Sequence, residues 1–144
     1  INLASTAASL DTNKYYSIFF MGANSNYRNV LVEDEFETMP DDDNSAYFRI
    51  VQAIPDSTPV NVRVNLFDAM VHHTNYSFGA VSAFMPVGQG QLQVQILDGN
   101  VEIASKLINA ESKKIYTILL SGVSNPTGPA QNKQITYIVN GRRQ

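Results

Sequence analysis

The sequence predicts an all-β protein built as a sandwich of short antiparallel strands. Residues 60–65 place three valines on one face and Asn, Arg and Asn on the other, and residues 91–96 alternate in the same way with glutamines outside. This period-two alternation indicates strands with one buried and one wet face, which antiparallel sheets need. Turn residues separate many further short apolar segments, a spacing typical of a sandwich or barrel of about ten or eleven strands.

Weaker patterns predict the remaining strands. Residues 115–120 are apolar on both faces and end before Gly122, which fits a central strand better than a helix. Val101–Ala110, and by sequence repetition Leu3–Leu10, fit either a short helix or a strand, and we favour a strand. Aromatic and β-branched content or alternating polarity predicts the other strands at 15–21, 29–36, 46–51, 70–78, 82–87 and 134–140.

Composition excludes several classes of protein. The chain has 144 residues, which suit one domain or one domain and part of another, and 44% of them are hydrophobic, enough for a core. A net charge of −3 without a basic patch argues against a nucleic-acid partner. The absence of cysteine excludes disulfides, thiolate metal sites and cysteine nucleophiles. No apolar run approaches the roughly 20 residues of a transmembrane segment.

The chain repeats itself after a shift of 100 residues without a gap. This repetition predicts that residues 1–39 are a partial repeat, the last strands of a preceding copy, that 40–45 are an acidic linker, and that 46–144 are a full copy. Since a few orphan strands cannot bury an apolar face alone, they must pack on the second repeat, exchange or pair with another chain, or belong to a trimmed tandem protein. The identities are Lys14/Lys114, Tyr16/Tyr116, Ile18/Ile118 and Gly22/Gly122.

Two clusters of polar residues are candidate metal sites. Adjacent residues on a strand point to opposite faces, so His72 and His73 are expected to be a surface pair and not ligands of one metal. The oxygen-rich run Asp41, Asp42 and Asp43 is a weak calcium candidate, together with Glu33, Glu35 or Glu37, but it lacks the glycine and spaced acids of a calcium loop. A solvated connector is the simpler interpretation.

The sequence contains no pattern that predicts a catalytic site. It has no G-x-S-x-G motif and no Ser-His-Asp order with supporting turns. Glu33 and Glu35 would alternate onto one strand face and could imitate a glycosidase pair, although exposed acids that discourage edge-to-edge aggregation explain them more simply. Most aromatic side chains are expected to fill the core. Those near turns, Tyr27, Tyr76 and Phe84, are the exceptions that could contact a sugar ring.

Four segments of this chain resemble the DUF4397 family, a domain of bacterial secreted and surface proteins. The first three segments are 46–56, which resembles A-x-x-R-x-x-N-A-S-P-D, 59–64 and 76–87; the last is 114–117, and 14–17 resembles it in turn. Departures include Gln52, Ile54 and Asn61 where the family has Asn, Ser and Asp. The resemblance implies an immunoglobulin-like or transthyretin-like β-sandwich outside the cytoplasm, in tandem copies, often lipid-anchored on Bacteroidetes-type bacteria. It carries over no catalytic residues.

These observations predict a non-enzymatic, extracytoplasmic structural, adhesion or interaction module of a bacterial cell-surface protein, located at the surface or in the periplasm. A lipid anchor would lie in a segment outside this chain, which begins at Ile1 and is expected to be processed or trimmed. No cofactor is expected. The expected partners are a second copy, through strand exchange or pairing, and a cell-surface glycan or protein. A carbohydrate-binding module is the alternative interpretation, and a glycosidase or accessory domain is a third.

Overall fold

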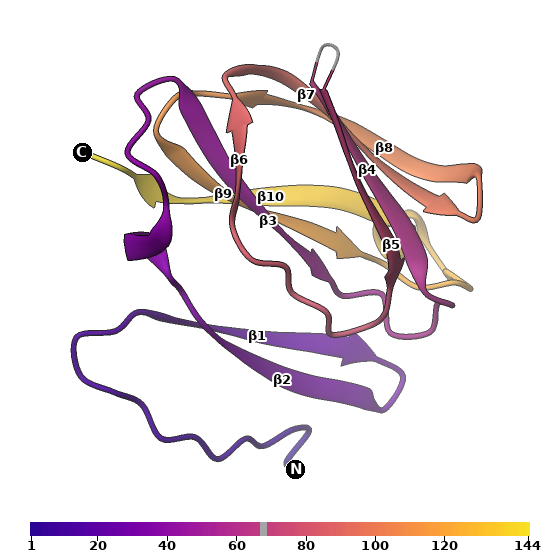
Figure 1. Ribbon diagram of the computed structural model, residues 1–144. Coiled ribbons are helices and arrows are strands. Elements are labelled where there is room, and N and C mark those ends of the chain that lie inside the picture. Colours follow the sequence, from indigo (N-terminus) through magenta and orange to yellow (C-terminus); the bar gives the residue numbers. More distant parts are fainter. Residues whose placement is uncertain (67–68) are drawn as a thin grey trace.

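Two four-stranded β-sheets packed face to face form the body of the molecule, and a separate two-stranded hairpin lies beside them (Figure 1). The computed structural model describes residues 1–66 and 69–144. The predicted all-β sandwich is confirmed, because the regular structure of these residues consists of ten strands and two single-turn 3-10 helices. No helix in the described ranges is long and apolar enough to cross a membrane.

The strands are ordered so that the last hairpin of the chain joins the first sheet. The separate hairpin consists of β1 (Tyr16–Ala23) and β2 (Asn26–Glu33). The first sheet has the order β10 (Gln134–Arg142), β9 (Lys114–Ser121), β3 (Ser45–Gln52), β6 (Met85–Gly88). The second sheet has the order β5 (Ala69–Tyr76), β4 (Val60–Leu66), β7 (Gly90–Asp98), β8 (Val101–Ala110). The 3-10 turns are η1 (Phe36–Thr38) and η2 (Pro129–Gln131).

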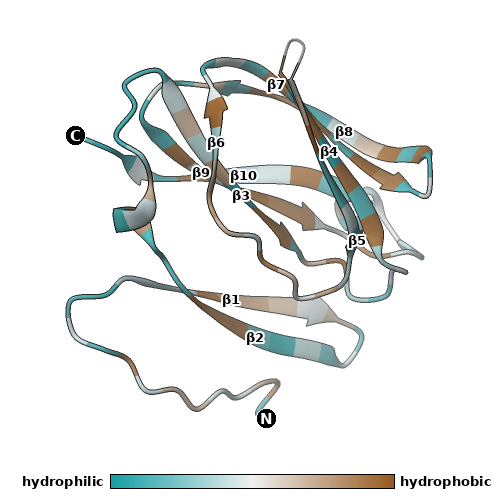
Figure 2. Ribbon diagram, viewed as in Figure 1, coloured by the Kyte–Doolittle hydropathy of each residue, from teal (hydrophilic) through white to brown (hydrophobic). Residues whose placement is uncertain are grey.

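One hydrophobic core fills the space between the two sheets. Val62 and Val64 of β4 and Val94 and Ile96 of β7 are buried, as the alternation predicted, while the polar residues between them are more exposed. Figure 2 shows the same alternation along β4. Burying each such branched side chain contributes about 1.5–3 kcal/mol, so the alternating strands supply much of the driving force for folding.

The two central strands of the first sheet are buried on both faces and run parallel to each other. Ile50 of β3 lies opposite Ile118 of β9, and both side chains are inaccessible to solvent. The prediction of a central strand at 115–120 is confirmed. The expectation of purely antiparallel pairing is wrong at this one pair, because apolar periodicity reports which faces are buried and carries no information on strand direction.

The segment Leu3–Leu10 is not a strand, whereas Val101–Ala110 is the strand β8. Residues 1–15 contain no regular strand, so the strand prediction for Leu3–Leu10 is wrong. The physical reason is that Leu3–Leu10 has no neighbouring strand to pair with among the described residues. β8 exists because it pairs with β7 along its whole length, and nothing in the described chain takes the place of β7 beside Leu3–Leu10. A strand pattern alone does not form a strand without a neighbour to satisfy its backbone.

The hairpins β1–β2 and β9–β10 share unusual backbone conformations 100 residues apart. Asn13 and Lys113 have φ angles of 67° and 63°, and Gly22 and Gly122 have φ angles of 134° and 113°. At Gly22 an added Cβ would lie 2.0 Å from the backbone oxygen of Asn26, and at Gly122 it would lie 2.5 Å from the backbone oxygen of Asn132. Both hairpins therefore need glycine where the chain leaves the first strand.

The same two hairpins begin with the same hydrogen bond. The backbone N–H of Asp11 donates to the hydroxyl of Tyr16 at 3.1 Å, and the N–H of Glu111 donates to the hydroxyl of Tyr116 at 3.0 Å. Each acid also forms an ion pair with the lysine three residues later, at 3.7 Å and 2.8 Å. The similarity of the two segments therefore extends from residue types to backbone angles and hydrogen bonds.

Candidate functional site

The β1–β2 hairpin lies on the outer face of the first sheet. Alternation along β1 directs Ser17, Phe19 and Met21 towards that sheet, and Met21 is buried. The outer face of the sheet offers Arg49, which lies on β3 between two apolar residues. The contact surface between hairpin and sandwich therefore combines apolar packing with a charged side chain of the sheet.

Arg49 is the centre of a buried polar network that joins the hairpin to the sandwich. Its Nη1 lies 2.5 Å from Oδ1 of Asp34, and the two side chains are only 1% and 6% exposed. Its Nη2 donates to Oγ of Ser17 at 2.8 Å, and its Nε donates to Oγ1 of Thr117 at 3.0 Å. Ser17 and Asp34 belong to the hairpin side and Thr117 to β9. We call these four residues the Arg49 joint.

Aromatic rings enclose the charge of the Arg49 joint. The guanidinium carbon of Arg49 lies 5.1 Å from the ring centre of Phe19 in β1 and 4.5 Å from that of Phe84. Phe84 packs in turn on Phe36 of η1. A desolvated guanidinium gains about 2 kcal/mol or more from such ring faces, so these rings partly offset the cost of removing the charge from water.

Both sides of the joint present the same kind of hydrogen-bonded pair. The hydroxyl of Ser17 donates to Asp34 at 2.7 Å, and the hydroxyl of Thr117 donates to Oδ1 of Asn140 at 2.5 Å. Asp34 directly follows Glu33, which pairs with Tyr16, and Asn140 directly follows the residue that pairs with Tyr116. Arg49 therefore bridges equivalent positions of the two hairpins.

A second contact fixes the far end of the hairpin. Arg28 of β2 donates from Nη1 to the carbonyl oxygen of Phe78 at 3.1 Å, and its guanidinium carbon lies 4.2 Å from the ring centre of the same residue. Asn26 donates to the carbonyl oxygen of Pro55 at 3.1 Å. With the Arg49 joint at one end and Arg28 at the other, the hairpin is held at two separated points.

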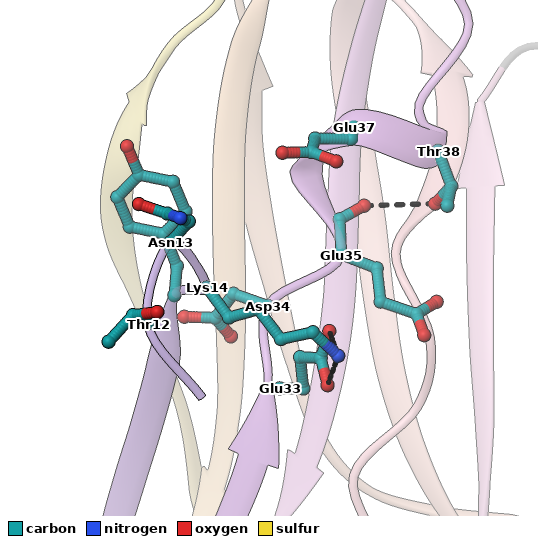
Figure 3. Close-up of a pocket in the computed structure, with 9 residues that line it drawn as sticks. Thr12, Asn13, Lys14, Glu33, Asp34, Glu35, Glu37 and Thr38 are labelled. Carbon is teal, nitrogen blue, oxygen red and sulfur yellow. Dashed lines mark hydrogen bonds and ion pairs between the residues drawn. The ribbon is translucent and has the colours of Figure 1, made fainter. Parts of the chain in front are cut away.

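A polar pocket of about 500 Å³ opens beside the Arg49 joint, where the residues just before β1 meet the segment after β2 (Figure 3). Lys14 lies in it and contacts the carboxylate of Glu33 at 2.9 Å. The hydrogen bond that Lys14 donates to Glu33, and the charge of that carboxylate, raise the pKa of Lys14 above the ordinary value. Tyr15 is 64% exposed, and its ring packs edge-on against Phe36. The other lining residues are Thr12, Asn13, Asp34, Glu35, Glu37 and Thr38.

Two of the three predicted acids of the connector have structural contacts in the turn before β3. Asp42 accepts hydrogen bonds from the backbone N–H of Asn44 and the hydroxyl of Ser45, and these bonds lower its pKa. Asp43 forms an ion pair with Lys113 at 2.5 Å. Asp41 is exposed. No group of three or more His, Asp or Glu side chains able to hold a metal is found among the described residues, and calcium binding here stays a prediction.

The predicted glutamates do not form a pair on one strand. Glu33 is the last residue of β2 and contacts Lys14, while Glu35 lies beyond the strand and its backbone oxygen accepts the hydroxyl of Thr38. The intervening Asp34 is the buried member of the group. Alternation would place Glu33 and Glu35 on one face only if the strand continued, and the chain leaves β2 before it reaches Glu35.

The adjacent histidines of β5 lie in different environments, as their alternation predicted. His72 is exposed opposite Arg63, whereas His73 lies opposite Val62 and contacts the ring of Tyr76 at 5.3 Å. Burial, and to a smaller extent the charge of His72, lowers the pKa of His73. Its Nε2 has no hydrogen-bond partner among the described residues.

The three aromatic residues near turns contact protein groups. Tyr27 stacks on Phe20 within the hairpin, with ring centres 5.7 Å apart. Tyr76 is half-buried against the core, and burial raises the pKa of its hydroxyl. Phe84 covers Arg49. The ring that the structure exposes beside polar groups is instead Tyr15, which sequence reasoning placed inside a strand.

Sequence reasoning missed the Arg49 joint. The available signal was an arginine inside the run 46–51, whose other members suit a strand buried on both faces. A charge at such a position needs a partner. Its partners Ser17, Asp34 and Thr117 are far away in sequence, so spacing could not identify them.

The fold and the joint define an all-β sandwich module that carries an additional hairpin like its own last two strands. The family model described as "Domain of unknown function (DUF4397)" matches residues 46–140, from the second residue of β3 into β10, and the chain belongs to this family. The match leaves the β1–β2 hairpin outside. Comparison with the curated proteins finds no match.

Proposed function

We propose that this chain is a non-enzymatic structural or adhesion module of a bacterial cell-surface protein, in which successive DUF4397 sandwiches are stacked in a fixed orientation. The observation that carries the proposal is the Arg49 joint, where a buried charge bridges two equivalent hairpins. Because an unpaired buried charge is costly, sliding or opening of this contact is penalised. A chain of modules joined in this way would extend as a stiff rod, which suits a surface structure.

The proposal includes the origin of residues 1–39 as the last strands of a preceding copy. Support comes from the shared φ angles at positions 13 and 113 and at positions 22 and 122, and from the shared tyrosine hydrogen bonds. Unrelated hairpins would have no reason to share all of these. The acidic segment 40–45 is then the linker between copies, and the sandwich from residue 46 is the complete copy.

The stiffness of the joint is tested by ¹⁵N relaxation of the full chain. We expect β1–β2 and the sandwich to tumble with a single correlation time, and Arg49→Ala to give the hairpin independent motion. Lys113→Ala, which removes an ion pair to the largely exposed Asp43, is the matched control and should leave the tumbling unchanged. Independent motion of the hairpin in the unsubstituted chain would contradict the proposal.

The location is tested on intact cells of the source organism. Antibody against the purified chain should label intact cells, and externally added protease should remove the label. Labelling that requires cell lysis would contradict an extracytoplasmic module.

The absence of enzyme activity is tested on glycoside, ester and peptide substrates. Turnover that Glu33→Gln abolishes would make the chain an enzyme.

The polar pocket gives the carbohydrate-binding alternative a specific location. Tyr15 exposes its ring beside the carboxylates of Glu33, Glu35 and Glu37, and stacking on an aromatic ring with hydrogen bonding to carboxylates suits a sugar. A glycan array would show binding that Tyr15→Ala removes and that Tyr137→Ala, an exposed tyrosine on β10, retains. An array without hits would remove this alternative.

A further inference from the structure

The outward face of the β1–β2 hairpin is apolar and exposed, although the equivalent face of the β9–β10 hairpin lies in the hydrophobic core. Ile18 and Phe20 are 66% and 57% exposed, whereas Ile118 and Leu120, 100 residues later, are both 0% exposed. In β9 these side chains point between the two sheets and belong to the hydrophobic core. The outward face of the hairpin is therefore an apolar surface on which no second sheet of the described chain packs.

In the sandwich, two parts of the structure cover the equivalent face of the β9–β10 hairpin. β3 pairs in parallel with the edge of β9 that faces away from β10, with Ile50 opposite Ile118. The second sheet then closes over that face through core residues that include Val62, Val94 and Ile108. In the described part of the chain β1 pairs only with β2, so both of these coverings are missing from the hairpin. A two-stranded hairpin with an exposed edge is marginal in water and open to pairing.

The segment before the hairpin already lies on this face. A largely apolar pocket of about 230 Å³, open to solvent, lies between Thr6, Ala8 and Leu10 on one side and Ile18, Asn29 and Leu31 on the other. The residues 100 positions after Ala8 and Leu10 are Ile108 and Ala110 of β8, which are buried in the core. The segment therefore occupies the side that β8 occupies in the sandwich, with an unfilled space beneath it.

From these observations we infer that the outward face of β1–β2, together with the free edge of β1, binds a polypeptide homologous to residues 46–100. One strand of the bound polypeptide pairs in parallel with β1, as β3 does with β9. Its remaining strands cover Ile18 and Phe20 and give residues 1–10 the partner that β7 gives to β8. This inference rests on the proposal that residues 1–39 are a partial copy.

A second copy of the chain fits the face less well. Its own residues 46–100 are already paired with its own β9 and β8, so it could offer only another hairpin. Two hairpins face to face would leave both β1 edges unpaired. One position of the face departs from the sandwich, since Asn29 lies opposite Phe20 where Ile135 lies opposite Leu120, so the new core has a polar rim at that end.

The inference is tested by fusing a copy of residues 46–100 directly before Ile1 of the full chain. Residue 1 is equivalent to residue 101, so the junction needs no linker. We expect the fused chain to contain two sandwiches, with amide exchange in β1 and β2 slowed by ~100-fold or more relative to the unfused chain. The added segment should also resist protease.

Two substitutions make the outcome specific. Ile18→Asp should leave the unfused chain unchanged in thermal unfolding, because the side chain is exposed there, but should abolish the protection in the fused chain. Aspartates at the positions equivalent to Val62 and Val64 of the added segment alone should abolish it as well. An added segment that stays open to protease or makes the chain aggregate, or protection that survives Ile18→Asp, would overturn the inference.

The failure of this inference can be told apart from the failure of the proposed function. Light scattering on the unfused chain that shows a dimer, dissociated by Phe20→Ser, would mean that a second copy covers the face and would overturn the inference. The Arg49 joint faces the opposite side of the hairpin, so relaxation of the Arg49→Ala variant reports on the stacked-module proposal independently of what binds the outward face.

Discussion

Arg49 holds a full charge where 1% of the side chain is exposed, and its energetics differ from those of the surface pairs. Removing one member of a buried pair leaves the other uncompensated, at a cost of about 3–5 kcal/mol, whereas replacing both by apolar groups is often close to neutral. Exposed pairs such as Lys113–Asp43 contribute about 0–1 kcal/mol. The joint is therefore sensitive to single substitutions and tolerant of paired ones.

We expect Arg49→Met to destabilise the docked hairpin by about 3–5 kcal/mol, and Arg49→Met combined with Asp34→Leu to cost less than the sum of the two single changes. Denaturant titration of the four chains of this double-mutant cycle measures the coupling. Lys113→Met is the surface control, with an expected effect of at most about 1 kcal/mol. Additive effects of Arg49→Met and Asp34→Leu would show that the pair contributes no coupling.

His73 gives the sandwich a pH dependence of its own. Burial lowers its pKa in the folded state, while the unfolded chain takes up the proton near pH 6.5. Below that pH the unfolded state binds more protons, so this histidine's contribution to stability is complete above about pH 6.5 and is lost as the pH falls towards the lower folded pKa.

The melting temperature should therefore fall between pH 7.5 and pH 5.0 by less in His73→Gln than in the unsubstituted chain. His72→Gln, at the exposed neighbouring position, is the control and should retain most of the fall. Equal falls in all three chains would assign the pH dependence to other groups. The measurement needs only thermal unfolding at two pH values.

At the level of strands, the sequence was informative wherever one residue pattern decides the outcome. Alternation placed β4 and β7, and apolar residues on both faces placed β9 in the centre of a sheet. The parallel pairing of β3 with β9 was not predictable, because periodicity describes faces and not directions. The strand prediction for Leu3–Leu10 was wrong for a related reason. This segment lies 100 residues before β8 and resembles it in pattern, but β8 is a strand because it pairs with β7.

Gly22, near the end of β1, and Gly122, just after β9, allow the two hairpins to be perturbed separately. Alanine at Gly22 or Gly122 would place Cβ 2.0 Å or 2.5 Å from a backbone oxygen at a positive φ angle, at a cost of about 1–3 kcal/mol. Gly122→Ala should lower the melting temperature of the sandwich, and Gly22→Ala should loosen only the hairpin. Gly99→Ala, at φ 58° with open space around it, is the control, with about 1–2 kcal/mol expected. Equal effects of Gly22→Ala and Gly122→Ala on the sandwich would contradict this separation.

The whole molecule combines a complete sandwich with a hairpin that has only one covered face. Parts of a structure with few buried apolar contacts open more easily than the core. We expect amides of β1 and β2 to exchange at least ~100-fold faster than those of β3 and β9. Hydrogen exchange followed by mass spectrometry measures this, and equal protection would mean that hairpin and sandwich unfold as one unit.

The prediction of a sandwich from sequence held for the molecule as a whole because ten short segments each contributed a local signal. The joint did not follow from sequence, because its four residues meet only after the sheet has formed. Arg49 gains partners from the hairpin and from β9, and no local window contains two of these elements together. Sequence patterns therefore reported the core well and the contact between the hairpin and the sandwich poorly.

The parallel pairing of β3 with β9 imposes an order of events on the ribosome. Arg49 and Thr117 are 68 residues apart, and at roughly 5–20 residues per second several seconds separate their synthesis. Throughout that interval the edge of β3 that pairs with β9 has no partner. The β1–β2 hairpin, made earlier and able to form within about 1–10 μs, has no finished surface on which to dock. The last hairpin to leave the ribosome therefore completes the sheet and, with it, the docking surface for the first.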